Sequence, residues 1–198
     1  MKPIVARANT ELRTTSTREL AITGLFVSLI AAGSQISIPL GPVPFTLQVF
    51  FVFLTSAILP AKKAFLAQFL YLLLGFFGFP VFSGFRSGLP VLFGPTGGFL
   101  LSFPFVAFLT AKARSFAAFQ ALCLLGLGLL YLIGGFWLGL YFGDVVKGFM
   151  VGVLPFFGWD LLKVFLVVRI AKKIGRYQNR VTEQVIAQQN GFYGESAD

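Results

Sequence analysis

The chain has 198 residues, of which 57% are hydrophobic and only 12% are charged, and its mean hydropathy is +0.85. Soluble domains carry about 25% charged residues, so this composition excludes an ordinary soluble domain. Two stretches, residues 87–111 and 115–143, contain no charged residue at all. Each is long enough to cross a hydrocarbon core of about 30 Å as a helix rising about 1.5 Å per residue. The sequence therefore predicts an all-α membrane protein.

Prolines and charged residues divide the apolar part of the chain into six segments, which we predict to be transmembrane helices. Three prolines within residues 39–44 end the first segment, and Pro60 and Pro80 end the second and third, because proline cannot continue a helix. The predicted spans are residues 20–38, 45–59, 64–79, 99–111, 116–142 and 159–172. They belong to one predicted domain at 20–175, between polar cytoplasmic segments at 1–19 and 176–198.

Two further apolar segments do not fit the length or composition of a span. Residues 81–98 are rich in Gly, Ser and Pro but also carry Phe, Val and Leu. Irregular backbone at membrane depth is tolerated only where protein covers it or where it lines a cavity, so we predict a loop that folds back over a pocket. Residues 145–154 are too short to cross and are predicted to be interfacial or re-entrant.

Basic residues are concentrated at alternate ends of the predicted helices. Most of the 16 Lys and Arg residues precede the first span, follow the sixth, or lie in the turns after the second and fourth spans. The positive-inside rule assigns these ends to the cytoplasm and therefore places both termini inside. The net charge of +9 is accordingly a topology signal, with anionic membrane lipid as the neighbour and no nucleic acid as a partner.

The strongest candidate for a functional site is the pair Asp160 and Lys163 in the last span. Residues three apart share one face of a helix. A charge at the centre of a membrane helix costs about 2.5–3.5 kcal/mol on insertion scales, so a charged pair there indicates a structural or functional role. Either the pair neutralises itself and ties the helix to its neighbours, or it offers an acceptor and a cationic donor to a polar ligand in a pocket.

Other polar residues in apolar surroundings leave two interpretations open. Arg86 in the loop at 81–98 either anchors the chain at lipid phosphate or binds a carboxylate at the mouth of a pocket. Gln48, Thr46 and Tyr71 either hydrogen-bond between helices or contact a ligand.

Small residues recur every four positions in the first span, at Gly24, Ser28 and Ala32. Such a row lets another helix approach closely. Spacing does not decide whether that helix belongs to this chain or to a partner.

The residue types needed for catalysis are scarce. There is no His, only one Cys, and no cluster of carboxylates, so the sequence offers no metal site. A Ser with Lys163 is the only nucleophile–base pair that the sequence allows. A phosphate-binding loop with the G-x-x-x-x-G-K-[ST] pattern is also missing. We therefore predict a binder or carrier without catalytic residues or a cofactor, rather than an enzyme.

Four stretches resemble the BioY family of biotin transporters, the substrate-binding S components of energy-coupling factor (ECF) systems. They are GPVPFTLQ at 41–48, YLLLGFFGFPVF at 71–82, LFGPTGGF at 92–99 and LPFFGWDLLK at 154–163. Their order and spacing fit, and the resemblance covers about residues 20–173.

The resemblance implies an S-component-like bundle of six helices in a bacterial cytoplasmic (inner) membrane, with biotin as the ligand. In the family, an Asp and a Lys of the last helix line the pocket, and Asp160 and Lys163 match them. A carboxylate and an ammonium suit the N–H groups and the carbonyl of the ureido ring, and Arg86 is our candidate for the valerate carboxylate. The matched stretches add as candidate ligand-binding residues Tyr71, Gln48, Phe93, Gly94 and Thr96.

The resemblance also implies partners. The family's first helix usually carries an Ala-x-x-x-Ala row that docks a transmembrane coupling protein, itself associated with ATPase subunits, and Gly24 and Ser28 stand in that row here. The loop near Gly84 and Arg86 departs from the amide or small residues common in the family. Uptake without the coupling module, an S component for another vitamin, a small intramembrane enzyme and a purely structural subunit stay open as alternatives.

Overall fold

The computed structural model describes the backbone of residues 2–174 and the side chains of residue 17 and residues 19–174. Over this range the chain is mainly helical. The elements in chain order are α1 (Lys2–Gln35), β1 (Ser37–Ile38), β2 (Phe45–Thr46), α2 (Gln48–Ile58), α3 (Ala61–Phe76), α4 (Leu89–Leu92), α5 (Gly97–Ala111), α6 (Phe116–Phe142), α7 (Val145–Gly152) and α8 (Phe157–Ile174). The predicted polar tail at 176–198 lies outside the described residues.

Each predicted span contains a helix, but the first connection differs from the prediction. The first helix ends at Gln35 instead of continuing to residue 38, and the second begins at Gln48 instead of residue 45. The residues between them form a short antiparallel hairpin that pairs Ser37 with Thr46. The prolines of residues 39–44 explain the difference, since they stop the helix and turn the chain back on itself.

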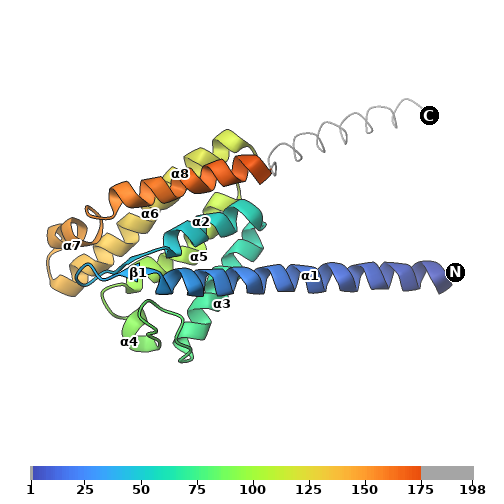
Figure 1. The fold of residues 1–198 in the computed structure, drawn as a ribbon, viewed down its shortest axis with the longest axis horizontal. Helices are drawn as coiled ribbons and strands as arrows, with labels where there is room; N and C mark the ends of the chain where they lie inside the picture. The colour runs from blue at the N-terminus through green and yellow to red at the C-terminus, as the bar shows by residue number, and fades with distance from the viewer. Residues whose placement is uncertain (1, 175–198) are drawn as a thin grey trace.

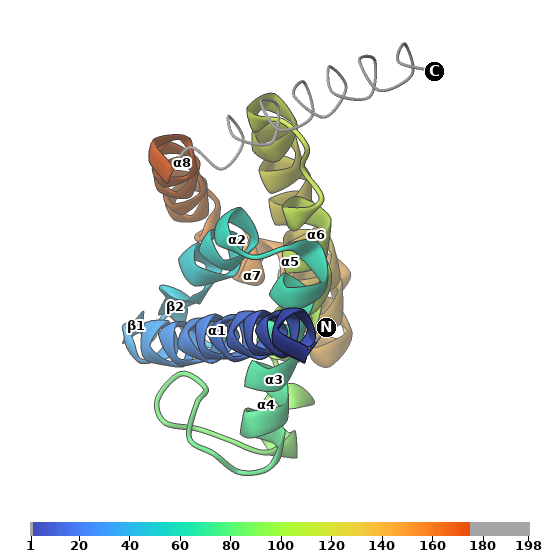
Figure 2. The same cartoon turned by 90° about the vertical axis from the view of Figure 1, so that its right-hand side faces the viewer.

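The elements form a bundle whose two ends differ. Helix α5 packs against α2, α3 and α6, while α2 also packs against α1 and α8. Figure 2, which looks along α1, shows α2 between α1 and α8. Figure 1 shows the start of α1 and the end of α8 on the same side of the bundle, with the β hairpin, α4 and α7 on the opposite side. We call these two sides the terminal end and the loop end.

Helix length and apolarity identify fewer membrane spans than the sequence predicts. Within the described residues, α6 (Phe116–Phe142) is long and apolar enough to cross a membrane. Helices α7 and α8 qualify only when taken together; they are bent by 54° at the break between them, as in a broken span or a re-entrant loop. Helices α2 and α5 are apolar but shorter, because the β hairpin and the 81–98 segment take up part of the length.

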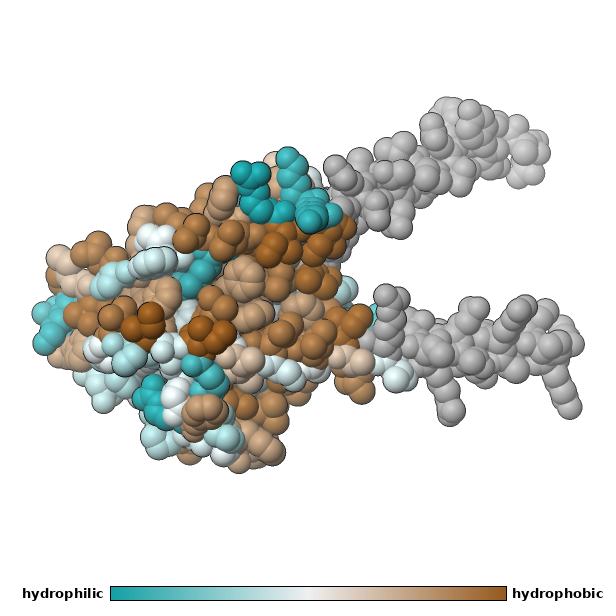
Figure 3. Space-filling view, in the orientation of Figure 1, coloured by the Kyte–Doolittle hydropathy of each residue, from teal (hydrophilic) through white to brown (hydrophobic). Residues whose placement is uncertain are grey.

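The outer surface of the bundle is mainly hydrophobic. Figure 3 shows hydrophobic residues over its body, with hydrophilic residues near the end of α8 and at the loop end. On α6, Leu124, Leu125 and Leu132 are more than half exposed, and Phe165 on α8 is 52% exposed. An apolar surface of this extent favours contact with lipid.

Glycines let the short helix α7 lie directly on α6. A Cβ atom added to Gly148 would lie 2.3 Å from the backbone nitrogen of Gly139 and 2.6 Å from the carbonyl oxygen of Gly135. Only a residue without a side chain permits this approach. The contact fixes α7, and with it Gly152, at the loop end of the bundle.

Candidate ligand-binding site

A cavity lies between α2, α5, α6 and α8 and continues under the β hairpin and the 81–98 segment. It contains about 610 Å³ of space free of atoms, including the part that opens to solvent. Most of its lining is apolar, from residues such as Val49, Phe82, Phe99, Leu100 and Phe156. Its polar and charged lining residues are Thr46, Gln48, Ser83, Arg86, Thr96, Tyr131, Asp160 and Lys163. An apolar wall with a few polar groups is typical of a small-molecule site.

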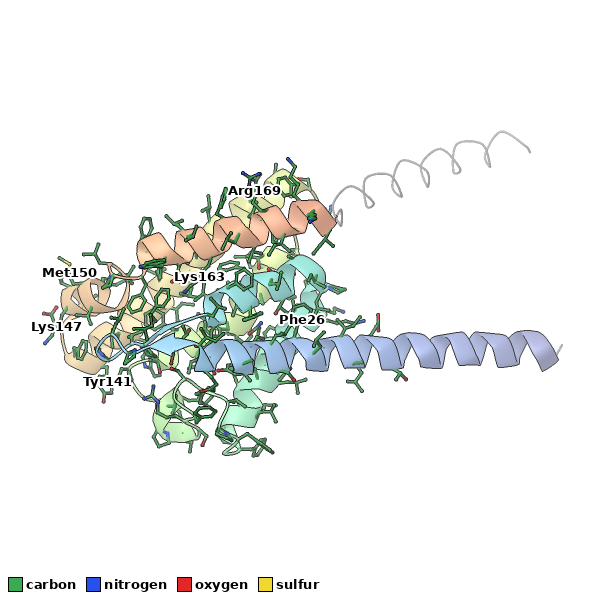
Figure 4. The ribbon with its side chains drawn as sticks, in the orientation of Figure 1. Phe26, Tyr141, Lys147, Met150, Lys163 and Arg169 are labelled. Carbon is green, nitrogen blue, oxygen red and sulfur yellow. The ribbon has the colours of Figure 1, made fainter. Side chains whose placement is uncertain are left out.

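Asp160 and Lys163 point into the bundle from the first two turns of α8, and Figure 4 shows Lys163 between α8 and α2. Both residues are buried, with 3% and 6% of their surface exposed. Lys163 Nζ donates to Asp160 Oδ1 at 2.7 Å and to the carbonyl oxygen of Thr46 at 2.7 Å. Its ammonium also lies 4.0 Å from the centre of the Phe45 ring. The pair therefore ties α8 to the β hairpin while it lines the cavity.

Tyr131 completes this network and was missed by the sequence reasoning. Its hydroxyl donates to Asp160 Oδ2 at 2.9 Å from the neighbouring helix α6. Both carboxylate oxygens of Asp160 are therefore engaged, one by an ammonium and one by a phenol. The one sequence feature that pointed to Tyr131 is a tyrosine within a predicted span that contains no charged residue. The same feature made Tyr71 a candidate.

Gln48 lines the cavity, whereas Tyr71 lies behind it. Gln48 Nε2 is 2.5 Å from the hydroxyl oxygen of Tyr71, and that hydroxyl donates in turn to the carbonyl of Val81 at 3.1 Å. Thr46 Oγ1 donates to Gln48 Oε1 at 3.1 Å. Tyr71 is fully buried and is outside the lining. Its geometry supports the interhelical interpretation, and direct ligand contact by Tyr71 has no geometric support.

The residues of the LFGPTGGF stretch separate into two groups. Thr96 lines the cavity, but Phe93 and Gly94 do not. The Phe93 side chain is 67% exposed, and the Gly94 carbonyl accepts a hydrogen bond from Trp137 Nε1 at 2.9 Å. Phe93 and Gly94 therefore lie outside the cavity lining in this structure, and a ligand contact by either residue stays a prediction without support from this geometry.

Arg86 reaches the cavity from residues 81–88, which we call the 81–88 loop and which form the second part of the connection between α3 and α4. Its Nε donates to the carbonyl of Ser83 at 3.0 Å, which fixes the guanidinium plane. In the described part of the chain no carboxylate forms an ion pair with Arg86. The remaining guanidinium donors are therefore open to an anionic group.

The row of small residues on α1 faces outward. Gly24, Ser28 and Ala32 are all exposed, and an added Cβ atom at Gly24 would meet nothing within 4 Å. The row therefore does not pack against another described helix of this chain, which removes one of the two interpretations left open by its spacing. No group of three or more potential metal-ligating side chains occurs among residues 17–174.

Comparison with known proteins identifies the family. The BioY family model matches residues 7–180, which is most of the chain. The chain belongs to the BioY family. It is 46% identical to the "Biotin transporter BioY" of Thermotoga maritima over 165 residues, which cover 81% of this chain and 98% of that protein. It is 42% identical to the "Probable biotin transporter BioY" of Pyrococcus horikoshii over 157 residues, which cover 79% and 96%.

A solved structure shows the same fold. The crystal structure of the S-component for biotin from an ECF-type ABC transporter superposes with a TM-score of 0.75 at 22% sequence identity, covering 81% of this chain and 92% of that one. The S-component-like helical architecture predicted for this BioY-family chain is thereby confirmed. The family and these relatives are transporters, so the chain is a membrane protein.

Proposed function

We propose that this BioY-family chain binds biotin in the cavity and takes it up across the cytoplasmic membrane, alone or as the S component of an ATP-driven ECF transporter. The observation that carries the proposal is the buried network of Asp160, Lys163 and Tyr131 on the wall of a mainly apolar cavity. Burying two charges is costly unless they are paired and hydrogen-bonded, and here they are also presented to an internal space.

The charge of the cavity suits a ligand with one carboxylate. Asp160 and Lys163 neutralise each other, so Arg86 leaves one positive charge in excess among the lining residues. Biotin carries a single carboxylate and a neutral ureido ring with two N–H donors and one carbonyl. The ion pair then hydrogen-bonds to the ureido ring, and Arg86 binds the carboxylate through charge-assisted hydrogen bonds. The apolar lining contacts the remaining carbon and sulfur atoms.

We further propose six membrane crossings with both termini in the cytoplasm. The hydrophobic outer surface and the common side of the two described ends support this arrangement. The exposed basic residues Arg169, Lys172 and Lys173 near the end of α8 lie on that side, as the positive-inside rule requires. In this topology the cavity lies near the outer, loop end of the bundle.

The outward row of Gly24, Ser28 and Ala32 is our candidate docking surface for the transmembrane coupling protein of an ECF system. Close approach of a partner helix needs small residues that are exposed on the helix surface, and all three residues of the row are exposed.

The proposed ligand is tested by equilibrium binding of labelled biotin to the purified chain in detergent, with a panel of other vitamins as competitors. We expect saturable binding at one site per chain and displacement by unlabelled biotin at the lowest concentration of the panel. Tighter binding of another vitamin would make the chain an S component for that compound. Absence of binding to the whole panel would contradict the assignment of the cavity as a vitamin site.

Replacing Arg86 with Gln is expected to weaken biotin binding by roughly 10- to 100-fold, because a charge-assisted hydrogen bond contributes about 1.5–3 kcal/mol. Biotin amide, which lacks the carboxylate, serves as the matched control ligand. The same substitution should change the affinity for the amide by less than about threefold. An equal loss for acid and amide would show that Arg86 does not recognise the carboxylate.

A further inference from the structure

We propose that Gln35, the last residue of α1, is a positioning residue for ligand binding, because it holds the 81–88 loop that brings Phe82 and Arg86 to the cavity. The inference rests on the proposed function and extends it to a residue outside the cavity lining. Gln35 acts on the ligand only through this loop.

The Gln35 side chain closes the turn at the tip of the loop from both sides. Its Nε2 donates to the carbonyl of Phe82 at 3.1 Å, and its Oε1 accepts from the backbone N–H of Phe85 at 3.0 Å. A single amide group thereby pairs with main-chain groups on both sides of Ser83 and Gly84. Phe82 and Phe85 lie 47 and 50 positions away from Gln35 in the sequence.

The turn needs such support because its backbone conformation is unfavourable. Phe85 has φ +55° and follows Gly84 with φ +71°. A residue with a Cβ atom in the left-handed region is strained, and such strain persists only where the surroundings impose it. The Phe85 side chain is 71% exposed, so burial does not hold it in place. Phe85 is held in this conformation by two sets of hydrogen bonds. Two backbone bonds, at 3.0 and 3.2 Å, join Phe82 and Arg86, and the Gln35 amide accepts from the Phe85 N–H.

Neighbouring contacts attach the same loop to α1 and α3. Ser34 Oγ lies 2.6 Å from the carbonyl oxygen of Val81, and the Tyr71 hydroxyl donates to that oxygen at 3.1 Å. At the other end of the loop, the Gly88 N–H donates to the carbonyl of Gly75 at 2.7 Å. Gln35 Nε2 also donates to Ser34 Oγ at 2.8 Å, so the Ser34 contact is linked to Gln35. The bonds from Tyr71 and to Gly75 fix the stem of the loop without Gln35, which leaves the turn carrying Arg86 as the part that Gln35 orders directly.

The test is the variant Gln35→Met, which keeps the size of the side chain and removes its hydrogen bonds to Phe82 and Phe85, together with the one that Nε2 donates to Ser34 Oγ at 2.8 Å. We expect biotin affinity to fall roughly tenfold, mainly through faster dissociation, with the melting temperature of the ligand-free protein nearly unchanged. Amide hydrogen exchange in residues 82–86 should become faster at the same time. Gln120→Met, the same change at an exposed position of α6, is the matched control. It should alter neither the biotin affinity nor the amide exchange of residues 82–86.

Two outcomes would overturn the inference: unchanged exchange at residues 82–86, or unchanged biotin affinity in a folded Gln35→Met protein. If Gln35→Met does not fold, Gln35→Glu decides the question, because it keeps the acceptor for Phe85 and loses the donor to Phe82. Failure of the wild-type chain to bind biotin would contradict the proposed function alone, since the exchange measurement tests the role of Gln35 without any ligand.

Discussion

Replacing Lys163 with Met is expected to weaken biotin binding by at least about 30-fold. Truncating one partner of a buried, hydrogen-bonded charge pair costs about 2–5 kcal/mol, part of which comes from the charge left behind. Here the substitution removes the donor to Asp160 and to the Thr46 carbonyl, and it leaves the Asp160 carboxylate with Tyr131 alone. Isothermal titration of the purified chain with biotin, or the rise in melting temperature that biotin causes, measures the loss.

The loss of an ion pair also lowers stability, so a control must separate folding from binding. The double variant Asp160→Asn with Lys163→Met contains no buried charge at these positions. We expect it to recover much of the thermal stability lost by Lys163→Met, because neutral replacements of a buried pair are often well tolerated. Biotin binding should stay weak in the double variant. Near-wild-type affinity in either variant would remove the pair from the proposed site.

The helices of this chain could be predicted from the sequence because each apolar run has a visible stop. Prolines, glycines and basic turns mark their ends, and α6 begins and ends at the predicted residues, Phe116 and Phe142. The first connection was less predictable. A strand pairing between Ser37 and Thr46 depends on contacts across a proline-rich turn, and hydropathy carries no information about them.

The charged members of the site were predictable for a different reason. A buried ionisable side chain in a membrane helix is costly, so Asp160 and Lys163 stand out against their surroundings. Apolar and hydroxyl-bearing lining residues do not stand out. In a protein surrounded by lipid, an apolar side chain is stable facing outward or inward, so the sequence did not show that Phe82 faces the cavity while Phe93 is exposed. For the same reason it missed Tyr131.

The role of the 81–88 loop was predictable from the sequence, but the contacts that hold it were not. The irregular, partly apolar sequence of residues 81–98 indicated a segment that covers a pocket, and Phe82, Ser83 and Arg86 do line the cavity. The way in which the loop is held was not predictable, because its supports come from distant helices. The Gln35 side chain on α1 bonds main-chain groups of the loop, and the Gly75 carbonyl on α3 accepts from the Gly88 N–H. Main-chain groups of this kind are present at every position, so the sequence does not show which of them a distant residue will pair with.

Replacing Gly75 with Ala is expected to reduce biotin affinity by at least about tenfold without any change in the cavity's own residues. A Cβ atom at this position would lie 2.0 Å from the tip of the Phe82 ring. The ring is 1% exposed and packs edge-on against Tyr71 at 5.5 Å, so that side is closed to it. The ring must therefore move toward the cavity that it lines, and it then occupies space needed by the ligand.

Gly128→Ala is the matched control for this prediction, since a Cβ atom there meets nothing within 4 Å on the exposed side of α6. It should leave biotin binding unchanged and the protein at least as stable, because alanine favours a helix over glycine by about 1 kcal/mol. Gly75→Ala itself should lower the free energy of unfolding by about 1–3 kcal/mol through overpacking. Adding Phe82→Leu to Gly75→Ala shortens the displaced side chain and should restore part of the affinity. Wild-type affinity in Gly75→Ala would show that Phe82 moves without entering the space that biotin occupies.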